Sequence, residues 1–173
     1  MLRLISIGSI CAIALAAGCS NHVDHDSAVT VMSSALTGTV AADGQVVHVD
    51  WTSAGGHVDV ALTNSAGSGS AQVVGTVTKN GSTTSESIDV TFNQWHDAIH
   101  NVTLDGTLHE AGTFSAPLPL SGDVTLTGAV AASGAVNATV DFDLKGSYSP
   151  SGFAVNGDVG GNVINASLQI SAP

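Results

Sequence analysis

The chain has 173 residues, 43% of them hydrophobic, which is enough for one globular domain with a buried core and excludes a disordered chain. Only 10% of the residues are charged. There are three basic and 14 acidic residues, which gives a net charge of −11 at pH 7. Because binding to nucleic acid or to anionic lipid headgroups needs clustered Lys and Arg, this composition excludes both as partners.

Residues 1–18 have the pattern of a secretory leader. Arg3 supplies the positive start, an apolar run follows from Leu4 to Leu15, and small residues precede Cys19. The apolar run is too short and too early in the chain for a membrane span. An ordinary signal peptide with an incidental cysteine, or an uncleaved helix, are the alternative interpretations.

The end of this leader, Leu15-Ala16-Ala17-Gly18-Cys19, resembles the lipobox of bacterial lipoproteins. The resemblance implies cleavage between Gly18 and Cys19, a diacylglycerol on the Cys19 sulfur and an acyl chain such as palmitate on the new amine. Ala16 departs from the leucine that is usual at its position. The resemblance covers the leader alone. It implies a protein of the bacterial cell envelope that is anchored to a membrane through the lipid on Cys19.

Residues 19–27 then form the lipidated cysteine and a short polar tether without apolar periodicity, which we expect to stay flexible beside the membrane. Ser20 follows the cysteine, and in enteric bacteria a serine there permits export to the outer membrane. The outer membrane is therefore favoured over the inner one. We expect the remaining residues, 28–173, to form a single β-domain.

From residue 28 onward, apolar and polar residues alternate, which is the pattern of strands with one buried face. The alternating runs span residues 29–40, 47–51, 58–62, 73–77, 88–92, 102–108, 114–130, 136–144, 153–159 and 164–170. Short turns such as Asn80-Gly81 separate the runs, so neighbouring strands should be antiparallel. A phase slip in the first run predicts a β-bulge near Ser33-Ser34. No stretch shows a clear helical period, and we predict an all-β antiparallel meander of about ten strands.

A short pattern, Leu/Val-x-Gly-x-Leu/Val, recurs on the apolar faces of these runs. Its glycines are Gly38, Gly75, Gly106, Gly122, Gly128 and Gly157. Because a glycine inside a strand marks a bend or a close approach, they favour a barrel-like or half-barrel sheet, with a β-sandwich as the alternative. Pro117 and Pro119 should place residues 115–119 at an edge or at a crossing between sheets.

Histidine is the one enrichment with metal-binding or catalytic chemistry, with seven residues. The spacing of His96 and His100 would suit zinc on a helix, but on a strand-like backbone the two rings would lie about 13 Å apart. The tether is richer in ligands and could hold a divalent cation weakly. The candidate metal ligands are His22, Asp24, His25, Asp26, His96 and His100.

The sequence contains no nucleophile elbow, phosphate loop or zinc helix, and we expect no cofactor. With Cys11 in the leader and Cys19 lipidated, no pair is left for a disulfide. Aromatic residues are only 4%, too few for the two girdles of a membrane-spanning barrel. We therefore predict a non-enzymatic, lipid-anchored binding or structural module, with an apolar ligand or an envelope protein as further partner. The alternatives are a metal-binding lipoprotein and a hydrolase whose site the sequence does not show.

Overall fold

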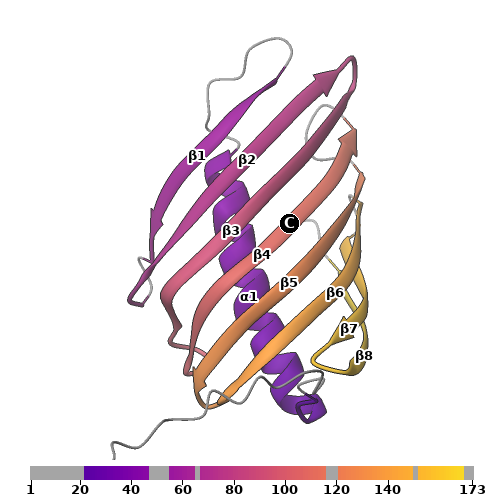
Figure 1. Cartoon of the computed structure of the whole chain (residues 1–173). Helices are drawn as coiled ribbons and strands as arrows, with labels where there is room; N and C mark the ends of the chain where they lie inside the picture. Colours follow the sequence, from indigo (N-terminus) through magenta and orange to yellow (C-terminus); the bar gives the residue numbers. More distant parts are fainter. Residues whose placement is uncertain (1–21, 47–54, 65–66, 116–120, 150–151, 170–173) are drawn as a thin grey trace, which may run out of the picture.

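The computed structural model describes residues 22–46, 55–64, 67–115, 121–149 and 152–169 (Figure 1). Within these ranges the chain forms one helix, α1 (His25–Val46), followed by eight strands. The strands are β1 (Gly55–Thr63), β2 (Ser70–Asn80), β3 (Thr83–Asp97), β4 (Val102–Ser115), β5 (Gly122–Gly134), β6 (Ala138–Ser149), β7 (Gly152–Val159) and β8 (Asn162–Gln169). In these ranges, no helix is long and apolar enough to cross a membrane.

The eight strands form one antiparallel sheet in the order of the sequence, each paired with the next. The predicted all-β meander is therefore confirmed, but about ten strands is wrong. Of the two other predicted runs, residues 29–40 belong to α1 and residues 47–51 lie outside the described ranges. The sheet is open, with β1 and β8 at its edges, so the expected barrel closure is not confirmed, and the strands do not divide into two sheets.

Helix α1 runs diagonally across one face of the twisted sheet (Figure 1). Its side chains at Ala28, Val31, Met32 and Ala35 are buried against the strands, at the i, i+3, i+4, i+7 spacing of one helical face. The predicted strand and its bulge at Ser33-Ser34 are thus wrong. Burial of apolar surface on the sheet outweighs the weak helix propensity of this Val- and Thr-rich segment.

The core lies between α1 and the sheet face that it covers, the inner face. Strands β1 to β8 all contribute buried apolar side chains to it, and each large one that is fully buried stabilises the fold by about 1.5–3 kcal/mol. The largest fully buried side chains are Ile88, Leu104, Leu108 and Leu144. The opposite face, the outer face, carries the alternate polar residues and is mostly exposed.

The inward glycines allow neighbouring strands to approach closely, as predicted. At Gly75 an added Cβ would lie 2.6 Å from the Ile88 Cα of the next strand, closer than any real contact. At Gly38, in the middle of α1, the same position is taken by the ring of Phe92. Glycine therefore lets both the strands and the helix pack without a gap.

The longest alternating run, residues 114–130, is two strands rather than one. Phe114 near the end of β4 pairs with Gly122 at the start of β5, and Ser115 N donates to Ser121 O at 2.9 Å. The chain therefore reverses direction between them. Pro117 and Pro119 lie outside the described residues.

Candidate functional site

The segment after the proposed anchor is attached to the far end of the chain. Val23 N donates to Gly160 O at 3.1 Å, and Asn162 Nδ2 donates to Val23 O at 2.8 Å. The Val23 side chain packs against the core. Within the predicted tether of residues 20–27, Val23 is thus bonded to the β7–β8 hairpin, and residues 25–27 belong to the first turn of α1.

Asp24 is the N-cap of α1. Its carboxylate accepts hydrogen bonds from Ser27 N at 3.0 Å, which satisfies a free amide of the first turn, and from Ser27 Oγ at 2.7 Å. The hydrogen bonds from the Ser27 side chain and backbone lower the pKa of Asp24 below its ordinary value of 3.8. Val23 and Asp24 are therefore fixed to the fold immediately before the helix.

The candidate metal ligands do not come together at one site, and each contacts residues near it. His25 Nδ1 lies 3.8 Å from Asp26 Oδ1 in an exposed pair, and His96 Nδ1 lies 3.1 Å from Thr103 Oγ1. His22 stands over Gly161. Across the part of the chain that the structure describes, no three His, Cys, Asp or Glu side chains come together as metal ligands. Metal binding gains no geometric support from these residues.

His100 belongs to a buried polar cluster around Asp97, at the end of β3. The Asp97 Oδ2 atom accepts hydrogen bonds from Ser34 Oγ of α1 at 2.8 Å and from His100 Nδ1 at 2.5 Å, and Oδ1 accepts from Ile99 N at 2.9 Å. Burial raises the pKa of Asp97, but the hydrogen bonds from His100, Ser34 and the backbone outweigh burial and leave the pKa below 3.8. This cluster, the Asp97 cluster, ties α1 to the turn between β3 and β4.

The sequence pattern hides the Asp97 cluster because β3 carries a bulge. The pairing with β4 shifts between Phe92 and Trp95, and Gln94 has a positive φ of 50°. Even-numbered residues up to Phe92 face inward, whereas beyond the bulge Trp95 and Asp97 do. The one sign of the bulge in the sequence is the spacing of Phe92 and Trp95, which are three residues apart and not two or four.

A second polar group lies on the outer face, where β3 and β4 pair. His109 Nδ1 is 2.7 Å from Asp89 Oδ1, and His109 Nε2 is 3.5 Å from Ser87 Oγ. This outer trio has the connectivity of a Ser-His-Asp triad. The His109 and Asp89 side chains are 46% and 57% exposed. In the Asp97 cluster, by contrast, Ser34 donates to the carboxylate and not to the imidazole, so nothing there activates the hydroxyl.

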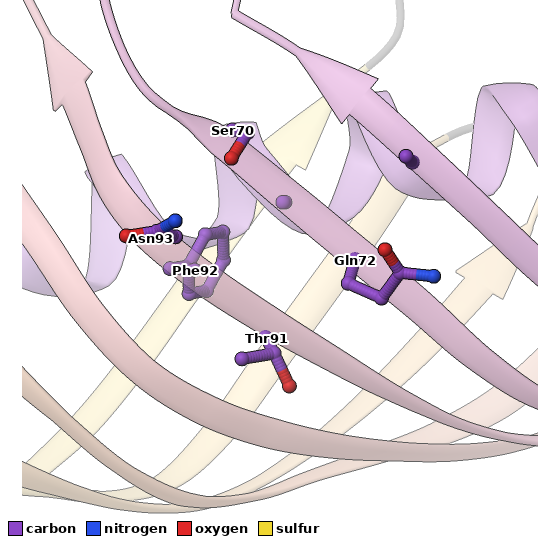
Figure 2. A pocket seen from close by; sticks show the side chains of 7 residues that line it. Ser70, Gln72, Thr91, Phe92 and Asn93 are labelled. Atoms are coloured by element: carbon purple, nitrogen blue, oxygen red, sulfur yellow. The ribbon is translucent and has the colours of Figure 1, made fainter.

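Two shallow depressions mark the sheet. Figure 2 shows the first, where β2 and β3 present the polar side chains of Ser70, Gln72, Thr91 and Asn93 on the outer face, while the Phe92 ring is buried on the inner side. The second lies beside the outer trio and is lined by residues of β3, β4 and β5, among them Ala111. On the inner face, the apolar side chains of the strands pack against α1 in the described residues.

Comparison with protein-family models, curated proteins and solved structures finds no match to this chain. Function must therefore be inferred from three features of the described residues. These are the attached N-terminal segment, the Asp97 cluster and the outer trio.

Proposed function

We propose that this chain is a lipid-anchored protein of the bacterial cell envelope, held through Cys19, whose sheet is a non-enzymatic binding or structural module. The observation that carries the proposal is the short distance along the chain between the lipobox-like leader and the folded domain. From Cys19 to Val23 the chain advances four residues, which span at most about 14 Å. A lipid at Cys19 would thus hold the domain directly against the bilayer.

The outer face supports a binding role in which charge selects the partner. Asp59, Asp89, Asp123 and Asp143 are exposed along it, and Asp143 pairs directly with Asp158 of the next strand. Such a concentration of negative charge repels anionic lipid and favours association with basic surfaces. The partner that fits this face is an envelope protein with a basic surface.

The anchor is tested by replacing Cys19 with serine in the full chain, expressed in a bacterium. The unaltered chain is expected in the membrane fraction, with a mature N-terminus at Cys19 that carries the mass of a diacylglycerol and an acyl chain. Cys19→Ser is expected to move essentially all of the protein to the soluble fraction, because both lipid groups of the proposed anchor are attached to Cys19. Cys11→Ser is the matched control and should stay in the membrane. An unmodified Cys19, or cleavage at another bond, would overturn the proposal.

A hydrolase is the alternative that one observation favours, namely the connectivity of the outer trio. A nucleophilic serine also needs hydrogen-bond donors for the developing oxyanion, and losing one such donor costs about 10²–10³ in rate. Strand β3 pairs with β2 on one side and β4 on the other, so the backbone amides around Ser87 are engaged in the sheet. For this reason we assign the trio to the solvated surface.

A fluorophosphonate probe, which reacts with activated serines, distinguishes these roles. We expect the unaltered chain and Ser87→Ala to show the same background labelling, because Ser87 lacks oxyanion donors. Labelling that disappears in both Ser87→Ala and His109→Ala would replace the non-enzymatic proposal with a hydrolase. All three residues are on the outer face, so both variants should fold.

A further inference from the structure

We propose that the anchored domain rests on the bilayer through one end of the sheet, with the Ile99 side chain inserted among the lipid headgroups. The contact surface consists of three turns, which we call the basal turns: residues 98–101 between β3 and β4, 135–137 between β5 and β6, and 160–161 between β7 and β8. This inference rests on the lipid anchor at Cys19 and adds the orientation of the domain to it.

The topology places the basal turns at the end where the chain leaves toward the anchor. In an antiparallel meander every second turn lies at the same end, and here the neighbouring turns are bonded, with Ala135 N donating to Asn101 O at 2.9 Å. Val23 is bonded to Gly160 in the third of these turns. Figure 1 shows the β7–β8 hairpin beside one end of α1. The four-residue reach from Cys19 therefore brings this end to the membrane.

Ile99 is the most exposed large apolar residue in the described ranges, with 88% of its surface accessible. Exposed apolar residues are common one at a time, and exposure alone identifies no partner. Ile99, however, sits at the tip of a turn whose backbone is fixed by the hydrogen bond from Ile99 N to the buried Asp97 carboxylate. Its side chain lies outside the core. A bilayer within reach of the tip gives its side chain an apolar environment.

Charge decides which lipid this end would meet. At the β3–β4 turn, which carries Ile99, the adjoining Asp97 is only 8% exposed, but the carboxylate of Asp158 accepts a hydrogen bond from Gly161 N at the β7–β8 turn. Asp24 and Asp26, at the start of α1, are the exposed carboxylates nearest in sequence to the anchor. They favour neutral over anionic headgroups. A single isoleucine is too small to bind a membrane alone, so it orients a domain that the lipid holds.

The orientation is tested with the lipidated full chain in phosphatidylcholine vesicles. The Cys19 sulfur is blocked by lipid, so Ile99→Cys introduces the one free thiol of the mature chain, and Ser82→Cys does the same at the opposite end. The same environment-sensitive fluorophore is attached to each. With spin-labelled lipid as quencher, we expect several-fold stronger quenching at position 99 than at position 82.

A third label, at Ala135→Cys, separates the role of Ile99 from that of the fluorophore. Its quenching is expected to fall at least twofold when Ile99→Asn is added, because the tip then loses its apolar contact. Equal quenching at positions 99 and 82, or no effect of Ile99→Asn, would overturn the docking and leave the anchor intact. A mature chain whose mass shows no lipid on Cys19 would overturn both proposals.

Discussion

Asp97→Ala is expected to lower the free energy of unfolding by roughly 3 kcal/mol, measured by chemical denaturation. The Asp97 carboxylate is 8% exposed and accepts hydrogen bonds from both Ser34 of α1 and His100 of the adjoining turn. Ser34 is fully buried, so in the variant its hydroxyl would lose this acceptor inside the core. The helix and the β3–β4 turn would lose their shared attachment at the same time.

Asp89→Ala is the matched control for this prediction. Asp89 lies on the same strand and also contacts a histidine, at 2.7 Å, but the pair is about half exposed. Water screens such a pair, and its loss should cost no more than about 0.5 kcal/mol. Equal losses in the two variants would contradict a special role for Asp97.

The pH dependence of stability is a second test of the role of Asp97. Its pKa is lowered in the folded state, so its carboxylate stabilises the fold above the unfolded pKa of about 3.8, and this contribution is lost as the pH falls through the folded pKa. The difference in stability between the unaltered chain and Asp97→Asn should therefore be largest near neutral pH. It should shrink as the pH falls below 3.8. A difference that does not change with pH would contradict this assignment.

The second large effect is expected at Gly157, in β7. Gly157→Ala should destabilise the domain by roughly 3 kcal/mol, because two costs act together. The backbone has a positive φ of 146°, which a residue with a Cβ rarely adopts. An added Cβ would also lie 2.9 Å from Leu144 Cα and closer still to Asp143 O. Thermal and chemical denaturation both measure the loss.

Two other glycines separate these costs. Gly75 meets the backbone of β3 without the strained φ, whereas Gly81 has a φ of 61° with open space around it. Gly81→Ala should cost about 1–2 kcal/mol, from conformation alone, and Gly75→Ala reports the close approach alone. If Gly157→Ala were no worse than Gly81→Ala, close packing of the strands at Gly157 would be excluded.

Much of the sheet follows from local pattern. Strict alternation predicted the inward side chains of the strands up to the bulge in β3, and Asn80-Gly81 predicted a tight turn between β2 and β3, which the structure places one residue later, at Gly81-Ser82. These features depend on near neighbours in sequence, which is why they can be read from it. Close approach at inward glycines was predicted for the same reason.

The helix was missed because its sequence fits two periods. Val29 and Val31 alternate as in a strand, and the β-branched residues of this segment favour that interpretation. The segment forms a helix because its apolar side chains cover the apolar face of the sheet, and this contact joins residues that are far apart in the sequence. The local sign was the capping pair Asp24 and Ser27, which precedes the apolar positions.

The polar groups were missed for a different reason. The Asp97 cluster needs the bulge in β3, and the outer trio needs the register that sets Asp89 opposite His109. Neither the bulge nor the register is visible in one strand alone. Cys19, in contrast, could be nominated from five consecutive residues, and its lipidation stays a prediction.

The hydrogen bond from Asn162 to Val23 spans 139 positions of the chain, and it has a consequence for the order of folding. A meander can assemble strand by strand, since each strand needs only its predecessor. The start of α1, however, gains its final contacts only when the last hairpin exists. In a chain synthesised from its N-terminus, Val23 therefore gains these hydrogen-bond partners only after β7 and β8 have been made, so the start of α1 is among the last parts of the fold to be completed.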